Sequence, residues 1–149
     1  MEVLLLGTGS ADGWPNAFCE CASCRWARDT GTLRLTTSAL VDGVLLLDCG
    51  PHTAAQAQRA GTDLARVRHV LLTHDHPDHS SPMALLTRSW AGREEPLHVH
   101  APAPVIEQWR HWVGPDDPVS WHEATVGAVH DADGYAAPLS VVRFSTIDD

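Results

Sequence analysis

Lysine is absent from this sequence of 149 residues, so arginine supplies all ten of its basic side chains. With nineteen acidic residues the formal net charge is −9, and the chain lacks the basic surface that binds nucleic acids or anionic membranes. No run of eighteen apolar residues occurs, which excludes a transmembrane helix. We therefore expect no membrane association and no nucleic-acid partner.

Cysteine is also scarce, and no basic group precedes the first aliphatic run. Residues 1–9 carry no basic group before their aliphatic run, so a secretory signal is not expected and the predicted compartment is the cytoplasm. Of only four cysteines, Cys19, Cys21 and Cys24 lie within six residues. In a reducing compartment this spacing favours a structural zinc site with one further ligand over disulfides. The alternative is three unrelated reduced cysteines.

The patterning of the chain indicates one layered α/β (α+β) domain over residues 1–149. A hydrophobic fraction of 44% and a mean hydropathy of −0.14 are typical of a globular protein. An Asp42-Gly43 pair between two apolar runs predicts a β-hairpin. Strands are predicted at 3–6, 36–40, 44–48, 67–73, 97–101, 118–121 and 139–144, and helices at 22–28, 52–60, 80–90 and 105–112.

Four potential metal ligands follow the predicted strand 67–73 within six residues: His74, His76, Asp78 and His79. In extended chain the first two side chains point to the same side, and Pro77 then ends the strand. The remaining two lie on the turn into the next helix, for which Ser80 or Ser81 is the expected N-cap. Imidazoles and a carboxylate suit zinc, manganese or iron, and two pairs of ligands favour a two-metal centre over a merely histidine-rich loop.

This stretch, hereafter the HxHxDH motif, resembles the signature of the metallo-β-lactamase-fold hydrolases. Matching segments are 5–10 (LLGTGS) and 47–50 (LDCG). The resemblance implies the N-terminal part of a four-layer αβ/βα sandwich with two metals in the cleft between its sheets. It also implies that His74 and His76 hold one metal and that Asp78 and His79 hold the other. Asp48 would lie in the shell behind the metals, and Asp78 would be catalytic by orienting the attacking hydroxide.

The cysteine spacing narrows the resemblance further. A CxCxxC loop before the HxHxDH motif is similar to the branch that contains the cyclic phosphodiesterase of phosphonate breakdown, where this loop carries a structural zinc. The tRNA 3′-processing endonucleases share the HxHxDH motif but lack the loop. The expected function is therefore a metal-dependent hydrolase, a phosphodiesterase that acts on a small phosphodiester or ester through a dinuclear centre.

The family's later ligands have no counterpart in the sequence. Its next histidine would fall near 144–146, where none occurs, and Asp148 and Asp149 are not assigned as the bridging carboxylate. His122 or His130 could complete the site. His98 and His100 are expected to pack on one strand face, and His52, His69 and His111 are expected to be ordinary helix or strand-edge residues.

We therefore expect an incomplete domain whose isolated activity is doubtful. A half sandwich leaves apolar strand faces open, which favours a homodimer or dependence on further sequence. The alternatives are a catalytically inactive metal-binding fragment and an accessory domain of a larger protein, for example one of the cobalamin pathway.

Overall fold

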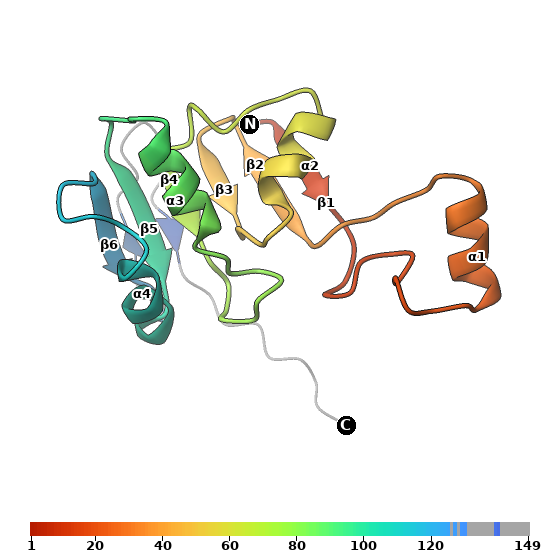
Figure 1. The fold of residues 1–149 in the computed structure, drawn as a ribbon. Helices are drawn as coiled ribbons and strands as arrows, with labels where there is room; N and C mark the ends of the chain where they lie inside the picture. Colours follow the sequence, from red (N-terminus) through yellow and green to blue (C-terminus); the bar gives the residue numbers. More distant parts are fainter. Residues whose placement is uncertain (126, 128, 131–138, 141–149) are drawn as a thin grey trace.

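Six strands form one mixed sheet in the computed structural model, in which neighbouring strands follow the order of the chain (Figure 1). The structure describes residues 1–125, 127, 129–130 and 139–140. The strands are β1 (Val3–Gly7), β2 (Ser38–Val41), β3 (Leu45–Leu47), β4 (His69–Leu71), β5 (Leu97–Ala101) and β6 (Val119–Glu123). Strands β1 to β3 pair antiparallel and β3 to β6 pair parallel. The α/β class expected from the sequence is confirmed.

The connections explain this change of direction. Asp42 and Gly43 have φ angles of 51° and 71°, the left-handed pair that a tight hairpin between β2 and β3 requires. The parallel strands are joined instead by helices α2 (Thr53–Arg59), α3 (Met83–Trp90) and α4 (Ala103–Arg110). Helix α3 begins after Pro82 without a side-chain cap, so the expected cap by Ser80 or Ser81 is wrong. The Ser80 hydroxyl instead accepts a hydrogen bond from the Trp109 indole at 3.0 Å.

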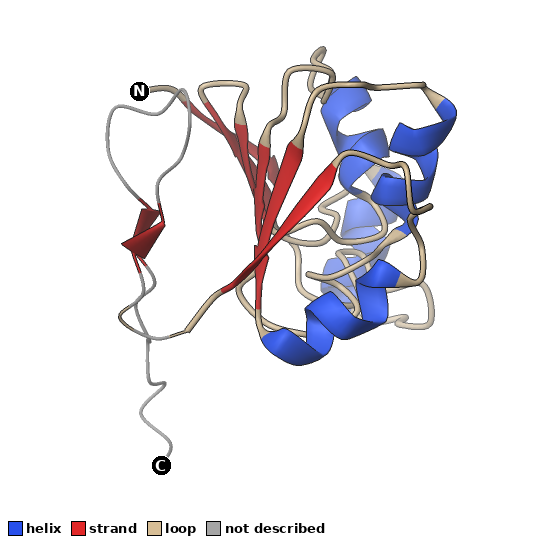
Figure 2. Ribbon diagram, turned by 90° about the vertical axis from the view of Figure 1, so that its left-hand side faces the viewer, coloured by secondary structure: helices blue, strands red, loops and turns tan. Residues whose placement is uncertain are grey.

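Helices α2, α3 and α4 cover one face of the sheet (Figure 2). Alternate strand residues point into this layer and form the core with Val105, Ile106 and Trp109 of α4. The core residues contributed by the strands include Leu46, Val70, Leu97, Val99 and Ala101.

The other sheet face carries no helix within the described residues. The short β7–β8 ladder is found on the same side of the sheet as this face (Figure 2). That ladder pairs Val129–His130 with Leu139–Ser140. On β1, Val3 and Leu5 are 51% and 63% exposed. The rest of the strand predicted at 139–144, the expected ligand position near 144–146, and Asp148 and Asp149 lie outside the described residues.

A segment over residues 8–35, hereafter the arm, projects from the sheet and carries α1 (Ala22–Asp29) (Figure 1). Trp14 and Trp26 stack within it at a ring-centroid distance of 5.8 Å, and the Arg34 guanidinium lies over the Trp14 ring. In the part of the chain that is described, no helix has the length and apolar character needed to cross a membrane.

Candidate metal centre

The HxHxDH motif lies in the loop between β4 and α3. Its three histidine rings are gathered, with centroid distances of 4.5 Å between His74 and His76 and 4.2 Å between His74 and His79. His76 is exposed, whereas His74, Asp78 and His79 are half-buried. The structure thus gathers the three rings of the motif and places Asp78 beside His79, where solvent reaches.

Asp48 anchors this loop from the end of β3. Its backbone has a φ of 57°, a left-handed conformation that aspartate tolerates better than most residues, and its side chain is only 5% exposed. The carboxylate accepts hydrogen bonds from the Thr73 backbone N–H at 2.8 Å and from the Thr73 hydroxyl at 2.8 and 3.0 Å. It also accepts one from His79 Nδ1 at 2.7 Å. Because a carboxylate can only accept, Asp48 fixes both the ring orientation and the tautomer of His79.

The tautomer of His79 has a direct consequence for its other nitrogen. With the proton of the neutral ring on Nδ1, the Nε2 lone pair lies 3.1 Å from the Asp78 carboxylate. A lone pair and a carboxylate oxygen at this distance repel unless a proton or a cation lies between them. The donor set and this orientation therefore fit a divalent metal held by Asp78 and His79.

Backbone contacts hold the β3 end against the motif. The Cys49 N–H donates to the His79 carbonyl at 2.8 Å, and the Ser81 N–H donates to the Cys49 carbonyl at 2.7 Å. A Cβ on Gly50 would lie 1.9 Å from the Asp78 carbonyl oxygen, so only glycine permits this approach. Burial raises the pKa of the Cys49 thiol to about 12, which leaves this cysteine as a packing residue.

The cysteines of the arm form a second candidate site. Among the residues that the structure describes, Cys19, Cys21 and Cys24 are the group whose three donor atoms all lie within 4.8 Å of one another. Cys21 is the N-cap of α1 and accepts a hydrogen bond from the Cys24 N–H at 3.4 Å. That bond, with help from Cys19, lowers the pKa of Cys21 to about 7, whereas burial raises the pKa of Cys24.

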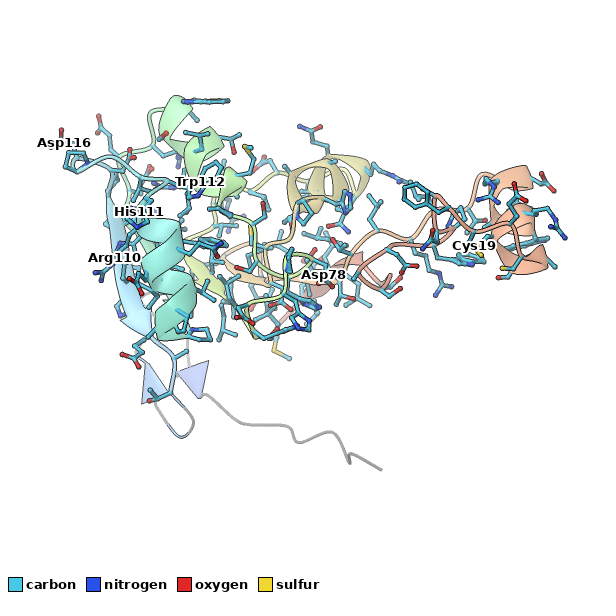
Figure 3. All side chains as sticks on the ribbon, turned by 60° about the horizontal axis from the view of Figure 1, so that its bottom comes forward. Cys19, Asp78, Arg110, His111, Trp112 and Asp116 are labelled. Atoms are coloured by element: carbon cyan, nitrogen blue, oxygen red, sulfur yellow. The ribbon has the colours of Figure 1, made fainter. Side chains whose placement is uncertain are left out.

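These two sites lie on different parts of the molecule. Cys19 is on the arm and Asp78 is beside the sheet (Figure 3). All four cysteines are free thiols in the structure. Three soft donors gathered on a projecting arm suit a structural metal, and nothing in this placement brings them to the HxHxDH motif.

The remaining histidines differ from the sequence expectations in one respect. His69 is 1% exposed in β4, so it is not an ordinary strand-edge residue. It lies beside His98 and His100 of β5, and His122 of β6 contacts both of the latter. His122 belongs to β6, which is separated by β5 from β4, the strand that precedes the HxHxDH loop. Its ring therefore lies beside β5 and not in that loop. His130 belongs to β7, and its side chain lies outside the described set.

Sequence reasoning did not assign a role to two residues that support the HxHxDH loop, Thr73 and Gly50. Thr73 and Gly50 act through backbone and short side-chain contacts that carry no metal-ligand signature. Only the segment 47–50, which the resemblance had singled out, pointed to this place.

Comparison with known proteins matches residues 44–145, about two thirds of the chain, to the family model described as a β-lactamase superfamily domain. A ribonuclease Z of Methanothermobacter thermautotrophicus is 30% identical over 151 aligned positions, which cover 94% of this chain and 44% of that protein. An octanoyltransferase of Porphyromonas gingivalis is 36% identical over 114 residues, 74% of this chain and 22% of that protein. Because one relative is by name a ribonuclease, the expectation that nucleic acid is excluded receives no support.

Solved structures resemble the fold over most of this chain. Zn²⁺-bound PqqB from Methylobacterium extorquens is 25% identical with a TM-score of 0.67, over 88% of this chain and 48% of that one. A diphosphatase of the PhnP family is 24% identical with a TM-score of 0.68, over 89% and 53%. The chain therefore spans about half the length of these structures and less than half of the two curated relatives.

Proposed function

The chain belongs to the metallo-β-lactamase superfamily of hydrolases, and on that premise we propose that it forms part of a metal-dependent phosphodiesterase. The observation that carries the proposal is the contact chain from Asp48 through His79 to Asp78. His79 contacts the buried Asp48 carboxylate through Nδ1 and the Asp78 carboxylate through Nε2, an arrangement that would suit a cation bound between Nε2 and Asp78.

The proposed ligand roles are those that the family resemblance implies. His74 and His76 would hold one divalent ion, zinc, manganese or iron, and Asp78 with His79 would hold the second. When bound, such ions polarise a phosphoryl oxygen and make water a competent nucleophile near neutral pH. Asp78 accepts a hydrogen bond from the attacking water, and Asp48 keeps the His79 ring in the binding tautomer.

We assign a structural zinc to Cys19, Cys21 and Cys24. The lowered pKa of the Cys21 thiol and the spacing of the three donor atoms support this assignment. These cysteines lie outside residues 44–145, which match the family model. The proposed compartment is the cytoplasm, where cysteines stay reduced.

The proposed substrate is a small phosphodiester. A net charge of −9 with ten arginines and no lysine leaves few cations to neutralise the phosphates of a long polyanion, which favours a small substrate. RNA is the second candidate, because the ribonuclease Z relative aligns with 94% of this chain. Hydrolysis of bis-p-nitrophenyl phosphate compared with a short RNA distinguishes the two.

We further propose that residues 1–149 need additional sequence or a second copy for full activity. The HxHxDH motif offers two ligands for each ion, and imprecise placement by even ~1 Å can cost ~100-fold in rate. The exposed side chains of Val3 and Leu5 leave apolar surface for a covering layer or a homodimer contact. An inactive metal-binding module, or an accessory domain of a larger protein such as one of the cobalamin pathway, is the competing proposal.

The test compares the 149-residue chain with a version extended by its natural downstream sequence, at equal metal loading. Turnover is expected only from the extended chain, and Asp78→Ala should abolish it. Asp75→Ala is the matched control because Asp75 is an exposed carboxylate of the same loop. Strong turnover by the short chain would refute the ligand count, and an inactive extended chain would favour the inactive module.

A further inference from the structure

Four histidines meet on the sheet face that carries no helix: His69, His98, His100 and His122, hereafter the histidine quartet. The parallel register sets His69 opposite His98 and His100 opposite His122. Because strand residues alternate, all four side chains point away from Val70 and Val99, which face the helices. The quartet is therefore a product of strand order and register across β4, β5 and β6.

The rings contact one another in two pairs. His69 Nδ1 lies 3.3 Å from His100 Nε2, and His98 Nδ1 lies 2.9 Å from His122 Nε2. The centroid distances of the four neighbouring ring pairs are 5.0, 5.6, 5.2 and 4.6 Å. His69 and His100 are 1% and 0% exposed, whereas His98 and His122 are half-buried.

Some of these spacings approach those of imidazoles around a tetrahedral ion, although the close nitrogens form two separate pairs. Zinc–nitrogen bonds of about 2.0–2.1 Å place two ligating nitrogens about 3.3 Å apart and their ring centroids about 5.2 Å apart. One nitrogen pair already has this spacing, and the four centroid distances lie on both sides of the expected value. Three of the four ring pairs are stacked, so binding requires rings to turn until a third nitrogen faces the ion.

We propose that the histidine quartet binds a divalent transition-metal ion of the zinc, copper and nickel class, at a site separate from the HxHxDH motif. Imidazole is the ligand these ions prefer, and the quartet contains no carboxylate that would favour magnesium or calcium. His69 and His98 offer Nδ1, and His100 and His122 offer Nε2. Binding of the ion requires the ring that donates in each pair to lose that proton or to move it to its other nitrogen.

Zinc stoichiometry tests the site. The variant His98→Gln/His122→Gln removes two donors but keeps hydrogen-bonding side chains, and His52→Gln/His111→Gln is the control with the same number of changes elsewhere. After equilibration with Zn²⁺ alone and gel filtration, the quartet variant should hold one zinc per chain fewer than wild type. The control should equal wild type, and circular dichroism should report the same fold for all three.

The same comparison in a His74→Ala/His76→Ala background separates this site from the proposed catalytic centre. A loss of one zinc that persists there supports the quartet even if the proposed hydrolase function fails. Equal zinc content in the quartet variant and the control would overturn the proposal.

A measurement on the unmodified chain guards against misfolding of the variants. Zn²⁺ should slow ethoxycarbonylation of His98 and His122 at least tenfold, as followed by peptide mass spectrometry. His111 on the C-cap of α4 is exposed and serves as the internal control, with an unchanged rate. Equal rates at His98 and His122 with and without zinc would exclude an ion at the quartet.

Discussion

Replacing Asp48 by asparagine tests the proposed centre most directly. The amide is nearly isosteric and tolerates the left-handed backbone at this position, where φ is 57°. Its oxygen still accepts from the Thr73 N–H, while its NH₂ group now faces His79 Nδ1. His79 must then accept at Nδ1 and carry its proton on Nε2, which removes the lone pair that faces Asp78.

The expected loss of metal affinity follows from the known contribution of a carboxylate that hydrogen-bonds to a metal-binding histidine. Loss of a carboxylate behind a metal-binding histidine weakens metal affinity by about 10–100-fold, which corresponds to about 1.4–2.8 kcal/mol. The metal-free protein should lose only about 1 kcal/mol of unfolding free energy, because each hydrogen bond keeps a partner. Asp48→Asn should therefore lower metal affinity much more than the stability of the metal-free protein. A general loss of folding would lower both.

Asp42→Asn is a close control for this experiment. Asp42 also has a positive φ, of 51°, and its carboxylate also accepts a backbone hydrogen bond, from Glu2 at 2.6 Å, at the hairpin turn. Zinc affinity is measured by chelator competition and stability by denaturant unfolding without metal. If Asp48→Asn binds zinc within twofold of the control, Asp48 does not set the His79 ring and the reasoning fails.

The other predictions use simpler assays. His74→Ala/His76→Ala should remove most metal uptake by the HxHxDH motif, and unchanged metal in elemental analysis would contradict the ligand assignment. Gly50→Ala should disrupt the same loop, because its Cβ would meet the Asp78 carbonyl; a wild-type zinc affinity would show that the loop can shift. In chelated protein, Cys21 alkylation should rise with pH to half its maximum near pH 7, since a lowered pKa leaves thiolate above that pH, while Cys49 stays unreactive. Equal rates for both cysteines across this range would refute the assigned pKa difference.

Much of the fold was accessible from local patterns. The strand predicted at 97–101 coincides with β5, and the helices predicted at 22–28 and 52–60 agree with α1 and α2 within one residue at each end. The Asp42-Gly43 turn was predictable because few residues tolerate left-handed backbone there. Boundaries shifted where tertiary contacts decided them. Helix α3 starts only after Pro82, since the Ser80 hydroxyl bonds to Trp109 instead of capping the helix.

The candidate ligands could be selected from the sequence, but the residues that support them could not. Histidines spaced two apart at a strand end share a side whatever surrounds them, so HxHxDH is readable from sequence alone. The pairing of Asp48 with His79 depends on β3 lying parallel to β4, and it spans 31 residues. Periodicity within one strand contains no information about which strand lies next to it, so only the family resemblance indicated Asp48.

The histidine quartet shows the same limit more sharply. From the sequence, His98 and His100 share a strand face, and a packing role was the simpler expectation. What changes their chemistry is the order β4-β5-β6, which adds His69 on one side and His122 on the other. A shift of one residue in either register would turn the flanking imidazole toward the helices and leave an isolated pair. The neighbouring imidazoles are thus a property of the assembled sheet, and the proposed ligand set has no motif in the sequence.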